Sequence, residues 1–113
     1  MPPNILVVSL DPALLETRHK LLLGAGYRVS KASTWAEFES ACGAHEFDLI
    51  LLGQSMPPSL KHDMHDFATK HCAKSKVAEF YLYAQSIPAK YSLNATVSDP
   101  EEFLAFVKRG LED

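Results

Sequence analysis

The apolar run Leu49–Leu52 constrains the fold of this chain more than any other stretch. Asp48 precedes the run and Gly53 follows it, so the run is too short for a helix. Consecutive aliphatic side chains without polar alternation predict a strand that is buried on both faces, as in a parallel sheet. Ligands of open α/β sheets bind beyond the carboxyl ends of the strands, so a functional site is expected near Gly53, Gln54 and Ser55.

The rest of the chain alternates strand and helix patterns. β-branched, aromatic or alternating residues predict further strands at residues 4–9, 27–32, 76–83 and 94–97. Apolar periodicity, with caps at Asp11, Thr34 and Asp99, predicts helices at residues 12–24, 34–43, 60–71 and 100–111. This order predicts a parallel sheet with right-handed crossovers and helices on both faces.

The helical patterns also predict which side chains are buried. In the first helix the leucines face the sheet and Arg18 faces outward, and Trp35 of the second helix lies in the core or at its rim. Cys42 and Cys72 fall in helical patterns, which suits buried, reduced thiols. The third helix is predicted to bury Leu60, Met64, Phe67 and His71.

One crossover is shorter than a parallel sheet normally requires. Residues 84–93 separate the last two predicted strands, and Pro88 lies among them. Parallel connections usually need a dozen or more residues and a helix, and proline disfavours a regular helix. An irregular loop or a single turn is therefore expected.

Composition limits the function classes. A chain of 113 residues has room for one domain, 1–113. The net charge of −3, with eleven Lys and Arg scattered along the chain, gives no basic stripe for nucleic acid. No apolar run has the length of a membrane span, and the amino-terminal residues lack the pattern of a signal peptide, so a cytoplasmic location is expected.

Over nearly its whole length the chain resembles the receiver domain of bacterial response regulators. The resemblance rests on ILVV followed by SLDP (residues 5–12), AGY (25–27), FDLILL with MP four residues later, and SDPEEFL (98–104). It implies a flavodoxin-like (CheY-like) three-layer α/β/α sandwich with a five-stranded parallel sheet in the order 2-1-3-4-5. The fourth helix of that fold would be shortened or absent here.

The residues that carry receiver chemistry are replaced. Receivers have a phosphoacceptor Asp at the end of strand three, an Mg²⁺-binding acidic pair after strand one, a Thr or Ser after strand four and a Lys after strand five. Of the acidic residues only Asp11 remains, and it is also a helix cap. The matching positions, which we call the vestigial pocket, are Ser9, Leu10, Asp11, Gly53, Tyr83 and Thr96.

These replacements contradict phosphoryl chemistry. Leu10 offers Mg²⁺ no ligand and Ser9 offers one neutral hydroxyl, whereas Mg²⁺ sites are usually anchored by one or two carboxylates. Gly53 has no side chain to attack phosphorus. The expected function is a degenerate, phosphorylation-incompetent receiver that acts as a protein-interaction module in two-component or phosphorelay signalling. No enzyme activity, metal or cofactor is expected.

Three alternatives remain open. A switch could be phosphorylated at a displaced residue, namely Ser9, Ser55 or Asp48, although neither serine has an evident activating base. The strand mouths could bind a small anion. A metal could bind the neighbouring side chains of the third helix, although a fourth ligand is not evident; these are His62, His65 and Asp66.

The strand at residues 76–83 suggests where a partner binds. One of its faces carries Val77, Glu79, Tyr81 and Tyr83, and an unpaired mid-strand carboxylate is costly to bury. Tyrosines are enriched at interfaces. The expected docking surface for a signalling protein or a second copy of the chain comprises Glu79, Tyr81, Tyr83, Ile87 and Tyr91.

Overall fold

A computed structural model describes residues 2–53, 57–72, 75–81, 92–94 and 100–112. The strands are β1 (Asn4–Val8), β2 (Arg28–Ala32), β3 (Leu49–Leu52), β4 (Lys76–Tyr81) and β5 (Ser92–Asn94). The helices are α1 (Pro12–Gly24), α2 (Trp35–Ala44), α3 (Pro58–His71) and α4 (Pro100–Glu112).

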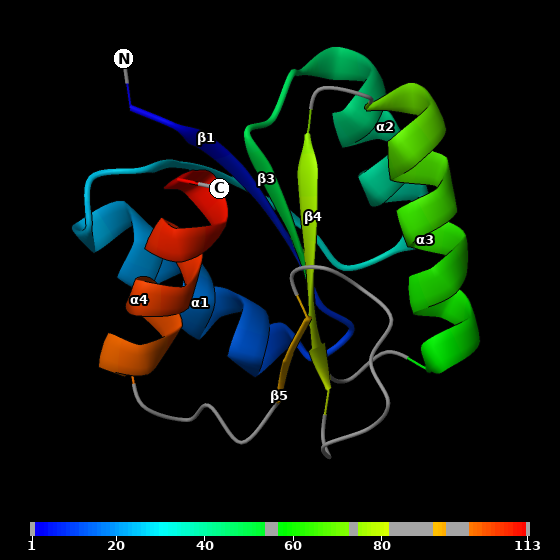
Figure 1. The fold of residues 1–113 in the computed structure, drawn as a ribbon. Helices are drawn as coiled ribbons and strands as arrows, with labels where there is room; N and C mark the ends of the chain where they lie inside the picture. The colour runs from blue at the N-terminus through cyan, green and yellow to red at the C-terminus, as the bar shows by residue number, and fades with distance from the viewer. Residues whose placement is uncertain (1, 54–56, 73–74, 82–91, 95–99, 113) are drawn as a thin grey trace.

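The strands form one parallel sheet between two layers of helices. The strand order is β2-β1-β3-β4-β5, and β5 is a three-residue strand at the edge beside β4. Helices α1 and α4 lie on one face of the sheet, and α2 and α3 lie on the other (Figure 1). The predicted three-layer α/β architecture with a parallel sheet is confirmed.

Strand β3 is buried on both faces, as the apolar run predicted, and β1 beside it is buried from Ile5 to Val8. Every residue of β3 is at most 1% exposed. Ile50 and Leu52 pack toward α2 and α3, whereas Leu49 and Leu51 pack toward α1 and α4. Because full burial of a leucine contributes about 1.5–3 kcal/mol, these strands anchor the core.

The helix caps near the carboxyl ends of the strands form as the sequence predicted. Asp11 Oδ1 accepts hydrogen bonds from Ala13 N (3.0 Å) and Leu14 N (3.3 Å) at the start of α1. At the start of α2, Thr34 Oγ1 accepts from Glu37 N at 3.1 Å, and Glu37 Oε1 accepts from Ser33 N at 2.7 Å. These bonds fix where each helix begins beside the sheet.

Arg18 faces inward, so the prediction that it points to solvent was wrong. Its side chain is 4% exposed, and its guanidinium carbon lies 5.4 Å from the ring centroid of Phe103 on α4. Burial lowers the pKa of Arg18 to about 10, and the nearby carboxylate of Asp11 opposes this shift. A long side chain can bury its stem and pack its cation on a ring, which leucine periodicity does not reveal.

The buried stripe of α3 is rotated from the predicted one. Lys61, Met64 and Ala68 are at most 2% exposed, whereas His71 at the end of the helix is exposed. Leu60 and Phe67, predicted to be in the core, are half-buried beside it. The core face of α3 therefore includes a lysine that the sequence pattern did not identify.

The predicted open face of β4 is closed at Val77. Val77 is 8% exposed and packs in the cluster of α2 and α3 residues, while its neighbour Ala78 is buried against the opposite layer. The side chains of Glu79 and Tyr81 lie outside the described residues. The unusually short crossover at residues 84–93 falls mainly in residues 82–91, which also lie outside them, and β5 begins at Ser92, two residues before its predicted start.

In the described part of the chain, none of the helices combines the length and apolarity needed to cross a membrane.

Candidate functional site

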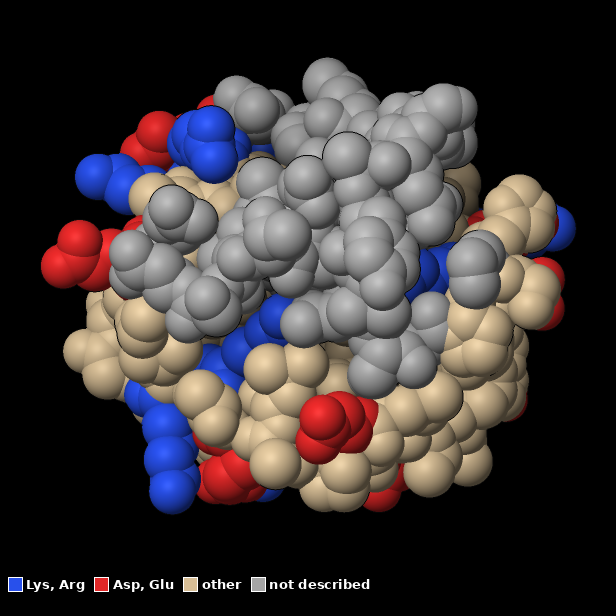
Figure 2. All heavy atoms as spheres, turned by 90° about the horizontal axis from the view of Figure 1, so that it is seen from below, with Lys and Arg blue, Asp and Glu red and all other residues tan. Residues whose placement is uncertain are grey.

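The strand ends that carry function in this class of sheet meet at one end of the molecule. β1 ends at Val8 and β3 ends at Leu52, and the two strands run side by side in register. We call the described residues that follow them, Ser9, Leu10, Asp11 and Gly53, the carboxyl mouth. Figure 2 views the molecule from this end, where Lys, Arg, Asp and Glu side chains are interspersed over the described surface and no sign of charge dominates.

Gly53 closes the carboxyl mouth at the position where the resemblance to receivers places an Asp. Its backbone N–H donates to Val8 O at 2.9 Å, so pairing between β3 and β1 continues beyond Leu52. A Cβ added to Gly53 would lie 2.9 Å from Val8 O and 3.3 Å from both Cβ and Oγ of Ser9. A separation below 3.0 Å from a backbone atom requires the backbone to shift. At residue 53 the mouth therefore offers neither a carboxylate nor the space for a Cβ.

Ser9 is enclosed within the carboxyl mouth. It is 0% exposed, and its backbone N–H donates to Ala32 O at 3.1 Å. Its Oγ accepts from Asp11 N at 3.2 Å and lies 3.4 Å from Asp11 O, to which it donates. The hydroxyl closes the turn between β1 and α1, a structural role that leaves it inaccessible to a phosphodonor.

Leu10 and Asp11 do not rebuild a metal site. Leu10 is 40% exposed and presents an apolar side chain where the resemblance places a carboxylate. The Asp11 carboxylate caps α1. A single carboxylate that already accepts two backbone hydrogen bonds is a poor start for octahedral Mg²⁺ coordination.

The other candidates lie away from the carboxyl mouth or outside the described residues. Asp48 is at the opposite, amino end of β3, where its Oδ2 accepts from Asn4 N at 2.8 Å. Within the described ranges no group of three or more His, Cys, Asp or Glu side chains could hold a metal ion, and His62, His65 and Asp66 form no such group. The candidates outside the described residues are Ser55, Tyr83, Ile87, Tyr91 and Thr96.

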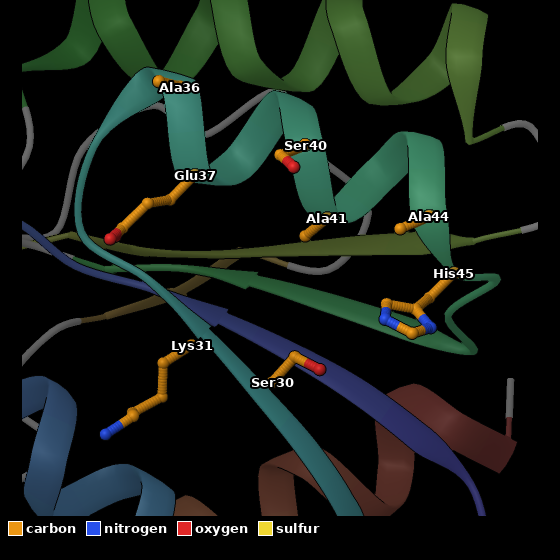
Figure 3. A pocket seen from close by; sticks show the side chains of 8 residues that line it. All are labelled: Ser30, Lys31, Ala36, Glu37, Ser40, Ala41, Ala44 and His45. Carbon is orange, nitrogen blue, oxygen red and sulfur yellow. The ribbon is translucent and has the colours of Figure 1, made fainter.

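A groove runs between α2 and the edge strand β2. It has a volume of about 460 Å³, and Figure 3 shows its lining from both elements. Its walls include Ser30, Lys31, Ala36, Glu37, Ser40, Ala41, Ala44 and His45. A second hollow of about 560 Å³ at the amino ends of β1 and β2 shares Ala44 and His45 with it.

The groove contains no assembled catalytic group. Its carboxylate, Glu37, accepts from the backbone N–H of Ser33 at 2.7 Å and from Ser33 Oγ at 2.9 Å. These hydrogen bonds lower the pKa of Glu37 and commit the side chain to capping α2. Lys31 Nζ forms an ion pair with Glu16 Oε2 at 2.9 Å and points away from α2 (Figure 3).

Sequence reasoning missed one backbone contact at the carboxyl mouth and the burial of one side chain of α3. The carbonyl of Val8, which excludes a side chain at residue 53, is a backbone group on another strand and leaves no local sequence signal. Lys61, 2% exposed in the first turns of α3, follows β3 closely along the chain. Only the three-dimensional packing of α3 on the sheet reveals its burial.

No family model matches the sequence, and no curated protein matches it significantly. Solved structures match its fold. A CheY-like receiver domain protein from Methanospirillum hungatei is 22% identical, with a TM-score of 0.84 over 99% of this chain and 95% of its own. A response regulator from Thermotoga maritima is 15% identical, with a TM-score of 0.86 over 100% of both chains.

A third match is the chemotaxis protein CheY4 of Vibrio cholerae, which is 16% identical, with a TM-score of 0.85 over 98% of this chain and 100% of its own. At these identities the likeness establishes the fold and not the chemistry. The chain therefore has the flavodoxin-like fold of CheY-like response-regulator receiver domains.

Proposed function

We propose that this chain is a single-domain, degenerate receiver, unable to accept a phosphoryl group, that acts as a protein-interaction module in two-component or phosphorelay signalling. The signalling context rests on the fold that it shares with response regulators. The loss of chemistry rests on one observation: at the acceptor position, Val8 O and Ser9 occupy the space that a side chain at residue 53 would need. The module is a binding partner rather than an enzyme.

The described part of the carboxyl mouth also argues against a switch displaced to Ser9 or Asp48. Ser9 is enclosed and Asp48 lies at the opposite end of its strand. An unactivated hydroxyl is a weak nucleophile even when it is accessible. Phosphoryl transfer at Ser9 would need a rearrangement of β1, and the exposed carboxylate of Asp48 lies away from the carboxyl mouth.

We expect no covalent phosphate when the chain is incubated with Mg²⁺ and acetyl phosphate. Intact mass should be unchanged, and Mg²⁺ with beryllofluoride should leave the amide NMR signals of residues 9–11 and 53 unshifted, because neither the carboxylates nor the space for them exists. A phosphorylatable receiver in the same reaction is the positive control. A phosphate adduct on this chain would contradict the proposal, and shifts produced by inorganic phosphate alone would favour the anion-binding alternative.

We further propose that the partner, either another signalling protein or a second copy of this chain, docks near the carboxyl end of β4, at Tyr81 and the residues that follow it. Tyr81→Glu and Tyr83→Glu should each weaken association about tenfold or more, since buried interface tyrosines are frequent hot spots. Light scattering and pull-down provide the measurement, with Ser40→Glu on exposed α2 as the control and circular dichroism as the test of folding. If both tyrosine variants associate as strongly as the parent chain, the proposed interface at the end of β4 is wrong.

A further inference from the structure

Two free thiols meet where α2 and α3 end. Cys42 lies in the last turns of α2, and Cys72 directly follows α3. The two residues are 30 positions apart along the chain. Cys72 Sγ donates to Cys42 O at 3.6 Å. Neither cysteine is in a disulfide, and their exposures are 7% and 9%.

We propose that Cys42 and Cys72 are a redox modification site, at which a low-molecular-weight disulfide such as oxidised glutathione converts the two thiols into a reversible intramolecular disulfide. This inference does not depend on the signalling role. It requires that the residues can come within bonding geometry, that one thiol can be reached and that the other resolves the intermediate.

The contact geometry meets the first requirement. A disulfide needs its two Cα atoms about 4.4–6.8 Å apart. The carbonyl oxygen that contacts Cys72 Sγ is two bonds from the Cys42 Cα, so the Cys72 sulfur already lies against the backbone of its partner residue. Rotations about the Cα–Cβ bonds, rather than movement of whole helices, should bring the sulfurs together.

The position of Cys72 at a helix end meets the second requirement. Cys72 is the C-cap of α3, and its backbone N–H makes the last hydrogen bond of the helix, to Ala68 O at 2.7 Å. Helix termini fray more readily than helix interiors. Opening of this last turn exposes the Cys72 sulfur without unfolding the sheet.

The environment of Cys42 assigns the order of reaction. Cys42 lies within α2, whereas Cys72 stands at the end of α3, so Cys72 is the thiol that becomes accessible and attacks first. Burial also raises the pKa of Cys42 to about 12, which disfavours its thiolate. The Cys72 thiolate forms a bond to one glutathione sulfur, the glutathione S–S bond breaks, and one glutathione thiolate leaves. Cys42 then loses its proton to that thiolate and attacks the Cys72 sulfur, which expels the second glutathione. Two cysteine thiols are oxidised and one glutathione disulfide is reduced to two thiols.

The disulfide would tie the ends of α2 and α3 together. Chain-entropy arguments for a closed loop of this length predict that oxidation raises Tm by roughly 10 °C or more. Both helices pack on the same face of the sheet, so oxidation would restrict that layer selectively (Figure 1).

The test is to incubate the folded chain with oxidised glutathione and measure intact mass, a non-reducing peptide map and Tm. We expect the mass to fall by two hydrogens, one peptide pair to be linked through Cys42 and Cys72, Tm to rise, and dithiothreitol to reverse all three. Retention of both free thiols in the native protein, or an end product that still carries glutathione, would overturn the proposal.

Single variants test the assigned order. Cys42→Ser should trap one glutathione on Cys72, because no thiol remains to resolve the intermediate, whereas Cys72→Ser should stay mostly unmodified. Equal labelling of the two variants would contradict the assignment of Cys72 as the attacking thiol. The linked peptide in the unsubstituted chain tests the disulfide itself even if a variant folds poorly.

Discussion

Gly53→Asp is expected to destabilise the chain by about 3–5 kcal/mol and to leave it unphosphorylated. Gly53 is buried, and any Cβ there would approach Val8 O to 2.9 Å. The carboxylate introduced at residue 53 would have no acidic pair beside it to hold a metal, since Ser9 and Leu10 occupy the positions where the resemblance places that pair. Restoring the acceptor alone therefore adds strain and a buried charge without restoring the reaction.

Two alanine variants separate the Cβ effect from the charge. Gly53→Ala should cost about 1–3 kcal/mol, because the added methyl overpacks the contact with β1. Gly43→Ala is the matched control: Gly43 is an exposed residue of α2, and a Cβ there meets nothing within 4 Å. It should gain about 0.5–1 kcal/mol from helix propensity.

Urea unfolding monitored by circular dichroism gives these free energies, and intact mass after acetyl phosphate treatment reports labelling. A Gly53→Ala variant as stable as the parent would show that the two strand ends separate easily. Mg²⁺-dependent labelling of Gly53→Asp would show that the pocket tolerates the acceptor. Either result would remove the main physical argument for a phosphorylation-incompetent receiver.

The elements that the sequence predicted well are those set by local patterns. The strand Leu49–Leu52 is found as predicted, because four consecutive aliphatic residues in so short a run are typical of a strand buried on both faces of a parallel sheet. The caps at Asp11 and Thr34 are also found, since a cap is a contact between residues two or three positions apart. Local chemistry thus fixes where elements begin and how strands alternate.

The errors concern long side chains, whose placement depends on the opposite layer. Arg18 was assigned to solvent, but Phe103 of α4 provides an aromatic ring for its guanidinium. His71 was assigned to the core but is exposed, whereas α3 buries Lys61 and Ala68 beside the correctly predicted Met64. A helical sequence pattern gives the spacing of the buried residues, whereas the packing of the helix on the sheet decides which face is buried.

The carboxyl mouth was half predictable. The absence of acidic side chains at residues 9, 10 and 53 can be read from the sequence. The closure of the mouth cannot, because it arises from a backbone carbonyl that approaches from a strand more than forty residues away in the chain. The structure thus adds a steric reason to expect no phosphorylation at residue 53, beside the chemical reason that a carboxylate is absent there.

Introducing an Asp at residue 9 and introducing one at residue 10 should have different effects on the free energy of unfolding. Ser9 is 0% exposed and its Oγ lies in the turn that leads to α1, whereas its neighbour Leu10 is 40% exposed. We expect Ser9→Asp to lower the free energy of unfolding by about 2–4 kcal/mol, since it buries a carboxylate without a cation. Leu10→Asp, which places the same group in solvent, should change it by less than about 0.5 kcal/mol.

The pH dependence provides the decisive comparison between these two variants. Burial should raise the pKa of the introduced Asp at residue 9 in the folded state above its unfolded value, so between the two values the folded state binds more protons. Unfolding free energy then falls as pH rises through this window, and the Ser9→Asp penalty should shrink on acidification below the folded-state pKa. The Leu10→Asp variant should follow the parent chain at every pH. Urea titrations between neutral pH and about pH 4, near the ordinary Asp value, measure both differences, and a pH-independent Ser9→Asp penalty would mean that its carboxylate escapes to solvent and that the mouth opens.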